Sequence, residues 1–228
     1  MTLSRAAAAE AIGTALLLAI VVGSGIMGER LAQGNAAVAL LANSLATGTG
    51  LYALILILGP VSGAHFNPVV SAVGIWDGRL SIRHGVVYVL AQICGAFAGV
   101  AAAHTMFGLP IVQVSTHVRP TLGEGFGEAI ATFGLVLIIS LALKYRVQSI
   151  PMAVAAFITS AYWFTSSTSF ANPAVTFARA MTDTFAGISP GSVPLFVGGQ
   201  LLGGAAATLL ARWLIGGNLA SSPELNRD

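Results

Sequence analysis

Six long apolar stretches constrain most strongly what this chain can fold into. They are Ala6–Met27, Ala36–Leu58, Gly85–Phe107, Gly125–Leu143, Pro151–Phe164 and Val193–Ile215. About 20 apolar residues are needed for a helix to cross a hydrocarbon core of ~30 Å. Only 8% of the residues are charged, whereas soluble domains carry roughly 25%. We therefore expect an all-α membrane protein with six transmembrane helices, forming a single domain over residues 1–228.

The charged residues between these stretches predict an orientation. An even number of crossings lets both termini lie in the cytoplasm, and most Lys and Arg residues then fall on that side: Arg5, Arg79, Arg83, Lys144, Arg146, Arg212 and Arg227. Only Arg30, Arg119 and Arg179 fall outside. This bias follows the positive-inside rule, so we expect a multi-pass protein of the inner or plasma membrane in contact with lipid. Without a cluster of basic residues, the net charge of +2 excludes a nucleic-acid partner.

The two halves of the chain are related to each other. Segment 10–14 (Glu-Ala-Ile-Gly-Thr) recurs at 128–132 (Glu-Ala-Ile-Ala-Thr), which defines repeats over about 5–107 and 124–216. Further pairs recur in the same order: Asn67-Pro68 with Asn172-Pro173, and Gln92 with Gln200. Because each half has an odd number of crossings, the second copy enters the membrane from the opposite side. Inverted repeats of this kind place a functional site near the bilayer midplane.

Each Asn-Pro pair predicts the start of a short helix. Asn is a preferred N-cap and Pro is favoured at the first helical position, so helices are expected from Asn67 to about Trp76 and from Asn172 to about Met181. The preceding segments, 59–66 and 165–171, are rich in Gly, Ser and Thr and are expected to be loops. Irregular backbone inside a membrane must be buried in protein or line an aqueous cavity. We therefore expect two re-entrant half-helices that meet beside a pore.

The half-helix tips favour passage of small neutral solutes. Each tip directs the positive end of a helix dipole at the midplane, which repels cations, and the Asn amides can donate hydrogen bonds to a solute. The expected central constriction consists of Asn67, Pro68, Val69, Asn172, Pro173 and Ala174. The sequence offers no triad, phosphate-binding loop or metal-ligand spacing, so we expect no enzyme activity, cofactor or metal site.

Three polar residues near the loops have two interpretations each. Glu10 and Glu128 are either proton carriers or braces for the loop amides, and their symmetric placement favours braces. His65 is either a pH-sensitive gate or a hydrogen-bonded structural brace, and we favour the second. Two charged pairs that follow the half-helices are expected at the membrane surface: Asp77 with Arg79, and Asp183 with Arg179.

Segments 62–69 (Ser-Gly-Ala-His-Phe-Asn-Pro-Val) and 170–174 (Phe-Ala-Asn-Pro-Ala) resemble the paired signature loops of the aquaporin, or major intrinsic protein, family. The resemblance covers essentially the whole chain. It implies a homotetramer of right-handed six-helix bundles, each with its own pore, a central Asn-Pro-Ala constriction and an outer selectivity filter. It also implies that Glu10 and Glu128 brace the loops. Val69 departs from the family, which usually has Ala at this position.

The outer filter departs further from the family pattern. Counting along that pattern places the filter at Thr47, Ser160, Ser169 and Val175, where Val175 replaces the usual arginine. This set contains no aromatic and no charged residue. Arg179, one helical turn outward of Val175, is a less favoured substitute for the missing arginine. The chain thus resembles bacterial aquaglyceroporins linked to metalloids, with a wide arginine-free filter. The resemblance implies passage of water, glycerol-like polyols, neutral arsenous acid and methylated arsenicals.

We therefore interpret the chain as a passive channel of aquaglyceroporin type. A coupled secondary transporter is the main alternative, because inverted repeats and broken helices also occur in that class. A non-conducting adhesion or scaffold protein with the same fold is the second.

Overall fold

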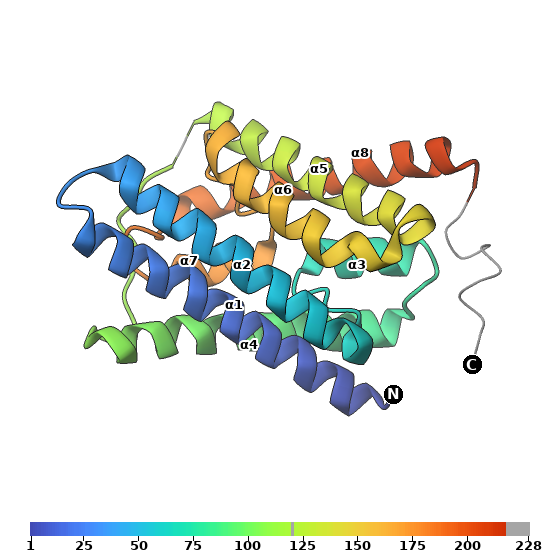
Figure 1. Cartoon of the computed structure of the whole chain (residues 1–228), viewed down its shortest axis with the longest axis horizontal. Helices are drawn as coiled ribbons and strands as arrows, with labels where there is room; N and C mark the ends of the chain where they lie inside the picture. Colours follow the sequence, from blue (N-terminus) through green and yellow to red (C-terminus); the bar gives the residue numbers. More distant parts are fainter. Residues whose placement is uncertain (120, 218–228) are drawn as a thin grey trace.

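A computed structural model describes residues 1–119 and 121–217, and helices dominate it (Figure 1). Arg227 and the end of the expected domain 1–228 lie outside these residues. The long helices are α1 (Leu3–Leu31), α2 (Ala36–Ser62), α4 (Ile82–Phe107), α5 (Leu122–Tyr145), α6 (Ile150–Phe164) and α8 (Val193–Ile215). The short ones are α3 (Pro68–Trp76), α7 (Pro173–Arg179), η1 (Val147–Ser149) and η2 (Pro190–Ser192).

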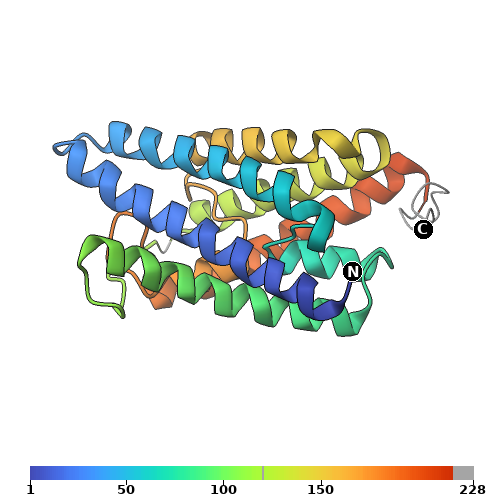
Figure 2. The ribbon, with the colours of Figure 1, turned by 60° about the horizontal axis from the view of Figure 1, so that its bottom comes forward.

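The membrane architecture expected from the sequence is confirmed. Within the described residues, six helical segments are long and apolar enough to cross a membrane. In Figures 1 and 2, α3 and α7 lie inside the bundle and approach its middle from opposite ends. They contact each other there. The protein is thus an all-α membrane protein with six spanning helices, two re-entrant half-helices and an inverted repeat.

The same helix crossing occurs in both halves of the molecule. Helix α1 packs closely on α4, and α5 packs closely on α8. A Cβ atom added to Gly95 would lie 2.2 Å from the Ala11 carbonyl oxygen, and one added to Gly203 would lie 2.1 Å from that of Ala129. No side chain fits at such distances, so glycine is required at both crossings.

Two predicted boundaries are wrong by a few residues. Gly59 and Pro60 were expected in a loop, but they lie in the last turn of α2, which is closed by a 2.8 Å bond from the Gly63 amide to the Gly59 carbonyl. Pro is tolerated here because membrane helices can satisfy the freed carbonyl in other ways. Helix α7 ends at Arg179 instead of Met181, because the Met181 amide bonds three residues back, to Ala178, in a tighter turn.

Candidate solute pore

Each half-helix begins at the asparagine that the sequence indicated. The Asn67 Oδ1 accepts a bond of 2.9 Å from the Val69 amide, and the Asn172 Oδ1 accepts one of 3.0 Å from the Ala174 amide. Both asparagines have extended backbone, and a proline follows each of them at the first helical position. The side-chain oxygens are therefore committed to capping, and the side-chain nitrogens remain as donors.

The two asparagines also bridge the repeats. Asn67 Nδ2 donates to the Ala171 carbonyl at 2.7 Å, and Asn172 Nδ2 donates to the Phe66 carbonyl at 2.7 Å. A primary amide has two N–H donors, so each asparagine keeps one for a passing solute. Both asparagines are buried in the protein and line the same cavity. This double bridge holds the tips of α3 and α7 together.

Glu10 binds the loop that precedes α3. Its carboxylate is fully buried and accepts bonds from the amides of His65 (2.9 Å) and Phe66 (2.7 Å). Ser62 Oγ (2.6 Å) and Gln92 Nε2 (2.8 Å) donate to it as well. Four donors hold the carboxylate in one position, so Glu10 can brace the loop whose amides it binds.

Glu128 makes the equivalent contacts in the second half. It is fully buried and accepts from the amides of Phe170 and Ala171, both at 2.8 Å, and from Gln200 Nε2 at 2.6 Å. Gln200 also donates to Thr176 Oγ1 at 2.8 Å, which ties the brace to α7. Glu128 and its counterpart in the first repeat do not line the cavity, so neither is placed to carry protons along it.

His65 contributes both to the loop and to the cavity wall. Its Nδ1 lies 3.1 Å from Ser71 Oγ on α3, and its ring meets the Tyr88 ring edge-on with 5.5 Å between centroids. The ring also lines the cavity. His65 thus braces the loop and also faces the solute pathway.

A cavity of about 180 Å³ runs past the half-helix tips. In Figures 1 and 2, α1 begins and α8 ends at the same end of the bundle. We call the part of the cavity lined by Arg79 the terminus-side mouth and the part lined by Arg179 the loop-side mouth. Its walls are mainly apolar, from residues such as Leu17, Val21, Leu51, Ile55, Leu135 and Ile139. Four residues of the expected constriction do not line the cavity: Pro68, Val69, Pro173 and Ala174. Val69 instead packs beside Gly204 of α8.

One residue of the expected filter is misplaced. Thr47, Ser169 and Val175 line the cavity, but Ser160 is exposed, and its hydroxyl donates back to the Ala156 carbonyl at 2.9 Å. The lining residues of α6 are Ile150, Val154, Ile158 and Tyr162. They recur every four residues, and Ser160 points about 200° away from Tyr162 around the helix.

Tyr162 occupies the place that Ser160 was expected to fill. Its hydroxyl donates to Thr47 Oγ1 at 3.2 Å and joins α6 to α2. The cavity wall beside Thr47 thus includes an aromatic residue, which the set of filter residues expected from the sequence does not contain. The four-residue stripe on α6 is visible in the sequence and could have indicated Tyr162.

Arg179 is the second correction at this mouth. It was expected at the membrane surface with Asp183, but its side chain is only 2% exposed and lines the cavity. The guanidinium lies over the Phe170 ring, 3.4 Å from its centroid, and Nε donates to the Ala186 carbonyl. Within residues 1–119 and 121–217, no carboxylate pairs with it. A positive charge therefore does stand at the loop-side mouth, one turn beyond Val175.

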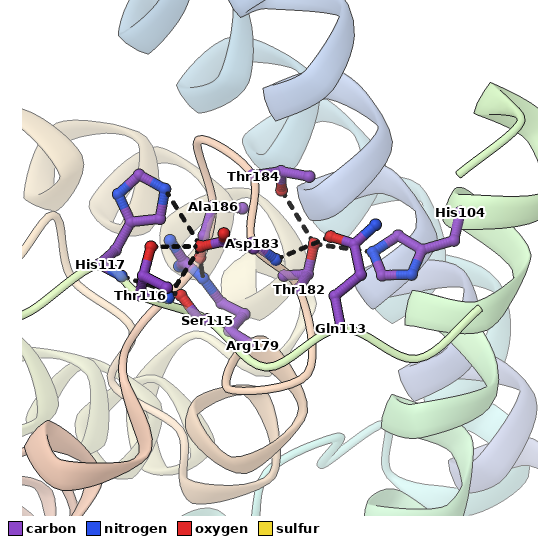
Figure 3. Close-up of polar contacts among 10 residues, drawn as sticks. All are labelled: His104, Gln113, Ser115, Thr116, His117, Arg179, Thr182, Asp183, Thr184 and Ala186. Atoms are coloured by element: carbon purple, nitrogen blue, oxygen red, sulfur yellow. Dashed lines mark hydrogen bonds and ion pairs between the residues drawn. The ribbon is translucent and has the colours of Figure 1, made fainter. Parts of the chain in front are cut away.

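A clamp between two loops holds the segment that follows Arg179 (Figure 3). Asp183 accepts from the amide and hydroxyl of Thr116 at 2.8 and 2.9 Å, and its own amide donates to Gln113 Oε1 at 3.0 Å. The hydrogen bonds from Thr116, with a smaller contribution from His117, lower the pKa of the Asp183 carboxyl. Asp183 thus pairs across the loops and not with the arginine.

The charges at the terminus-side mouth also differ from the expectation. Asp77 is 2% exposed, and Arg79 lines the cavity, so this pair does not lie on the surface. Asp77 accepts from Arg212 Nε at 3.1 Å and from Arg79 Nη2 at 3.3 Å. Among the described residues that line the cavity, the charged side chains are Arg79 and Arg179 alone. Among the described residues of the cavity wall, a cation would therefore meet like charge and no carboxylate.

The protein has six spanning helices and two half-helices whose asparagine-bearing tips meet beside a cavity. This arrangement defines an inverted-repeat membrane channel. The chain belongs to the major intrinsic protein family, whose sequence profile matches residues 1–149. It is 51% identical to the aquaglyceroporin AqpS of Rhizobium meliloti (strain 1021) over 93% of this chain and 91% of that protein. It is 31% identical to the probable aquaporin AqpM of Archaeoglobus fulgidus over 94% of this chain and 98% of that protein.

A solved structure agrees with this assignment at the level of the fold. The aquaglyceroporin from Plasmodium falciparum superposes with a TM-score of 0.73 and 20% identity, over 94% of this chain and 97% of that one. The protein is therefore a multi-pass channel of the aquaporin family for water and small solutes, not an enzyme.

Proposed function

We propose that this channel passively conducts neutral solutes larger than water, namely glycerol-like polyols, neutral metalloid acids such as arsenous acid, and methylated arsenicals, in addition to water. The observation that carries the proposal is that Val175 lines the cavity. The resemblance to the family pattern assigns the filter arginine to this position. The Arg179 guanidinium lies against Phe170 and the Ala186 carbonyl, one turn outward. Val175 leaves room that an arginine would occupy.

The polar groups along the cavity suit a solute with hydroxyls on one side. Ser169 Oγ is buried and has no hydrogen-bond partner within the described part of the chain, and it lines the cavity beside Thr47 and Val175. The spare amide hydrogens of Asn67 and Asn172 follow further along. Such groups replace some of the hydrogen bonds that a solute gives up on leaving water, while the apolar walls accept its carbon or metalloid face.

A passive channel fits the cavity better than a coupled transporter does. Coupling to an ion gradient needs a site that holds the ion, and no carboxylate lines the cavity within the described residues. Both buried glutamates, Glu10 and Glu128, are occupied by loop amides. The open cavity likewise argues against a purely structural scaffold.

We further propose one channel domain over residues 1–228, with repeats over about 5–107 and 124–216, assembled as a homotetramer in the inner or plasma membrane. Both termini would lie in the cytoplasm. The basic residues Arg79, Arg83 and Arg212 lie near the terminus-side mouth, in accord with the positive-inside rule.

Stopped-flow light scattering on proteoliposomes tests the proposal. We expect rapid equilibration of water, glycerol and neutral arsenous acid, each stopping at equal concentrations inside and outside. Imposing a proton or sodium gradient should leave that end point unchanged. Accumulation of solute beyond equilibrium would establish a coupled transporter, and vesicles that are impermeable although they contain folded protein would favour a scaffold.

A further inference from the structure

The terminus-side mouth holds an arginine whose donors are largely unused. Arg79 lies in the turn between α3 and α4 and lines the cavity. A guanidinium has five N–H donors, and the 3.3 Å contact from Nη2 to Asp77 uses one of them. The Arg79 Nε is buried and has no hydrogen-bond partner in the described part of the chain. A buried donor without a partner is costly unless something else satisfies it.

The carboxylate beside Arg79 does not neutralise this mouth. Asp77 is shared with Arg212, whose Nε lies 3.1 Å from the other carboxylate oxygen. Arg212 also donates to the Trp76 carbonyl at 2.7 Å and does not line the cavity. One negative charge between two positive ones leaves a net positive charge, and Arg79 is the member of the group that faces the cavity.

His65 lines the same cavity as Arg79. The Arg79 amide bonds to the Gly74 carbonyl at 2.9 Å, and the His65 ring also lies close to Gly74. Ser71 Oγ accepts from Gln92 Nε2 at 3.0 Å and lies 3.1 Å from His65 Nδ1. The roles of Ser71 Oγ and His65 Nδ1 depend on the His65 tautomer, and the tautomer in which Ser71 donates leaves an N–H on Nε2.

We propose that Arg79 and His65 form a binding site for the oxygens of a small oxyacid or its anion at the terminus-side mouth. Guanidinium and imidazole N–H groups supply donors, and within the described residues no carboxylate of the cavity wall competes for them. Arginine matches pairs of oxygens on one centre, whereas a cation finds no carboxylate among the described residues of the cavity wall. The site rests on the proposed function, since it lies on the same solute pathway.

Inhibition of water flow by inorganic phosphate tests the site. Water permeability of proteoliposomes is measured by sucrose shock, with phosphate at equal concentration on both sides and with sodium chloride of matched ionic strength as the reference. For the unmodified protein we expect permeability to fall as phosphate rises. Arg79→Gln should raise the half-inhibitory concentration at least about tenfold, and Arg79→Lys should raise it less.

Arg83→Gln is the matched control, because Arg83 carries the same charge in the neighbouring first turn of α4 but is exposed and does not line the cavity. It should leave the phosphate curve within twofold of the original. The inference is overturned if phosphate inhibits no more than chloride, or if Arg79→Gln and Arg83→Gln shift the curve equally. Loss of water flow without phosphate in the unmodified protein would refute the proposed function instead.

Discussion

Asn67 donates a 2.7 Å hydrogen bond to the carbonyl of Ala171, the residue before the second Asn-Pro pair. Asn172 donates a bond of the same length to the carbonyl of Phe66, the residue before the first pair. Each asparagine also caps its own half-helix. One side chain in each repeat thus starts a helix, joins the repeats and offers its remaining N–H to the cavity. The cavity passes this point beside both amides.

Removing an asparagine that both caps a helix and bridges the repeats should lower the free energy of unfolding more than removing a simple cap. We expect Asn172→Ala to lower the free energy of unfolding by about 2–4 kcal/mol, because it removes a cap and a buried bridge. Asn35→Ala, which removes the exposed cap of α2 at Ala37 and Val38, should cost about 1 kcal/mol. Thermal unfolding in detergent compares the two. Equal losses would mean that the bridge adds nothing.

The side of α6 that lines the cavity predicts different effects for Tyr162 and Ser160. Tyr162→Phe removes the hydroxyl that bonds Thr47 and should change the glycerol-to-water permeability ratio by about threefold, the effect of a net hydrogen bond near 0.7 kcal/mol. Ser160→Ala should leave the ratio unchanged, because Ser160 faces away from the cavity. A change with Ser160→Ala alone would restore the filter expected from counting along the family pattern.

Arg179 should exclude cations at the loop-side mouth. We expect Arg179→Gln to raise potassium leak through proteoliposomes roughly tenfold, because it removes a unit charge from the cavity wall. Arg119→Gln is the matched control. Arg119 also lies near the Phe170 ring, at 5.4 Å, and donates to the Ser167 carbonyl, but it does not line the cavity. Equal leak in both variants would assign Arg179 to bracing alone.

The loop clamp should weaken in acid. The pKa of Asp183 is lowered from its model-compound value of 3.8 by the bonds from Thr116, so its contribution to stability is fully present above pH 3.8. It is lost as the pH falls through the lower folded-state pKa. We expect Asp183→Asn to remove this part of the acid dependence of the melting temperature, which falls below about pH 4. An identical acid slope in both proteins would show that the clamp contributes nothing.

The repeat, the half-helices and their contacts follow from local signals in the sequence. Glu10 and Glu128 stand out as buried charges in apolar runs, and an Asn-Pro pair specifies a helix start within three residues. The rotation of α6 does not follow in this way. Counting back from Asn172 assumes a fixed geometry for the loop 165–171, and the structure shows a different register, with Tyr162 inward.

The positions of Arg79 and Arg179 at the cavity wall could not be predicted from the sequence for a different reason. A charge just past a helix end suggests an interface, but Arg179 is buried against the Phe170 ring. The segment that follows it is held by bonds from Thr116 to Asp183, 67 residues apart in the sequence. Arg79 is likewise paired with Asp77, which also accepts a hydrogen bond from Arg212 of α8. Such long-range contacts leave no periodic signal in the sequence.

The permeability of Val175 variants tests the central claim most directly. Val175→Arg places an arginine at the cavity wall, and Val175→Thr changes the chemistry at nearly constant volume. Stopped-flow measurements should show that Val175→Arg lowers glycerol permeability at least about tenfold more than water permeability, whereas Val175→Thr keeps both within about threefold. Unchanged glycerol and water rates in folded Val175→Arg protein would contradict a solute path beside Val175 and the two asparagines.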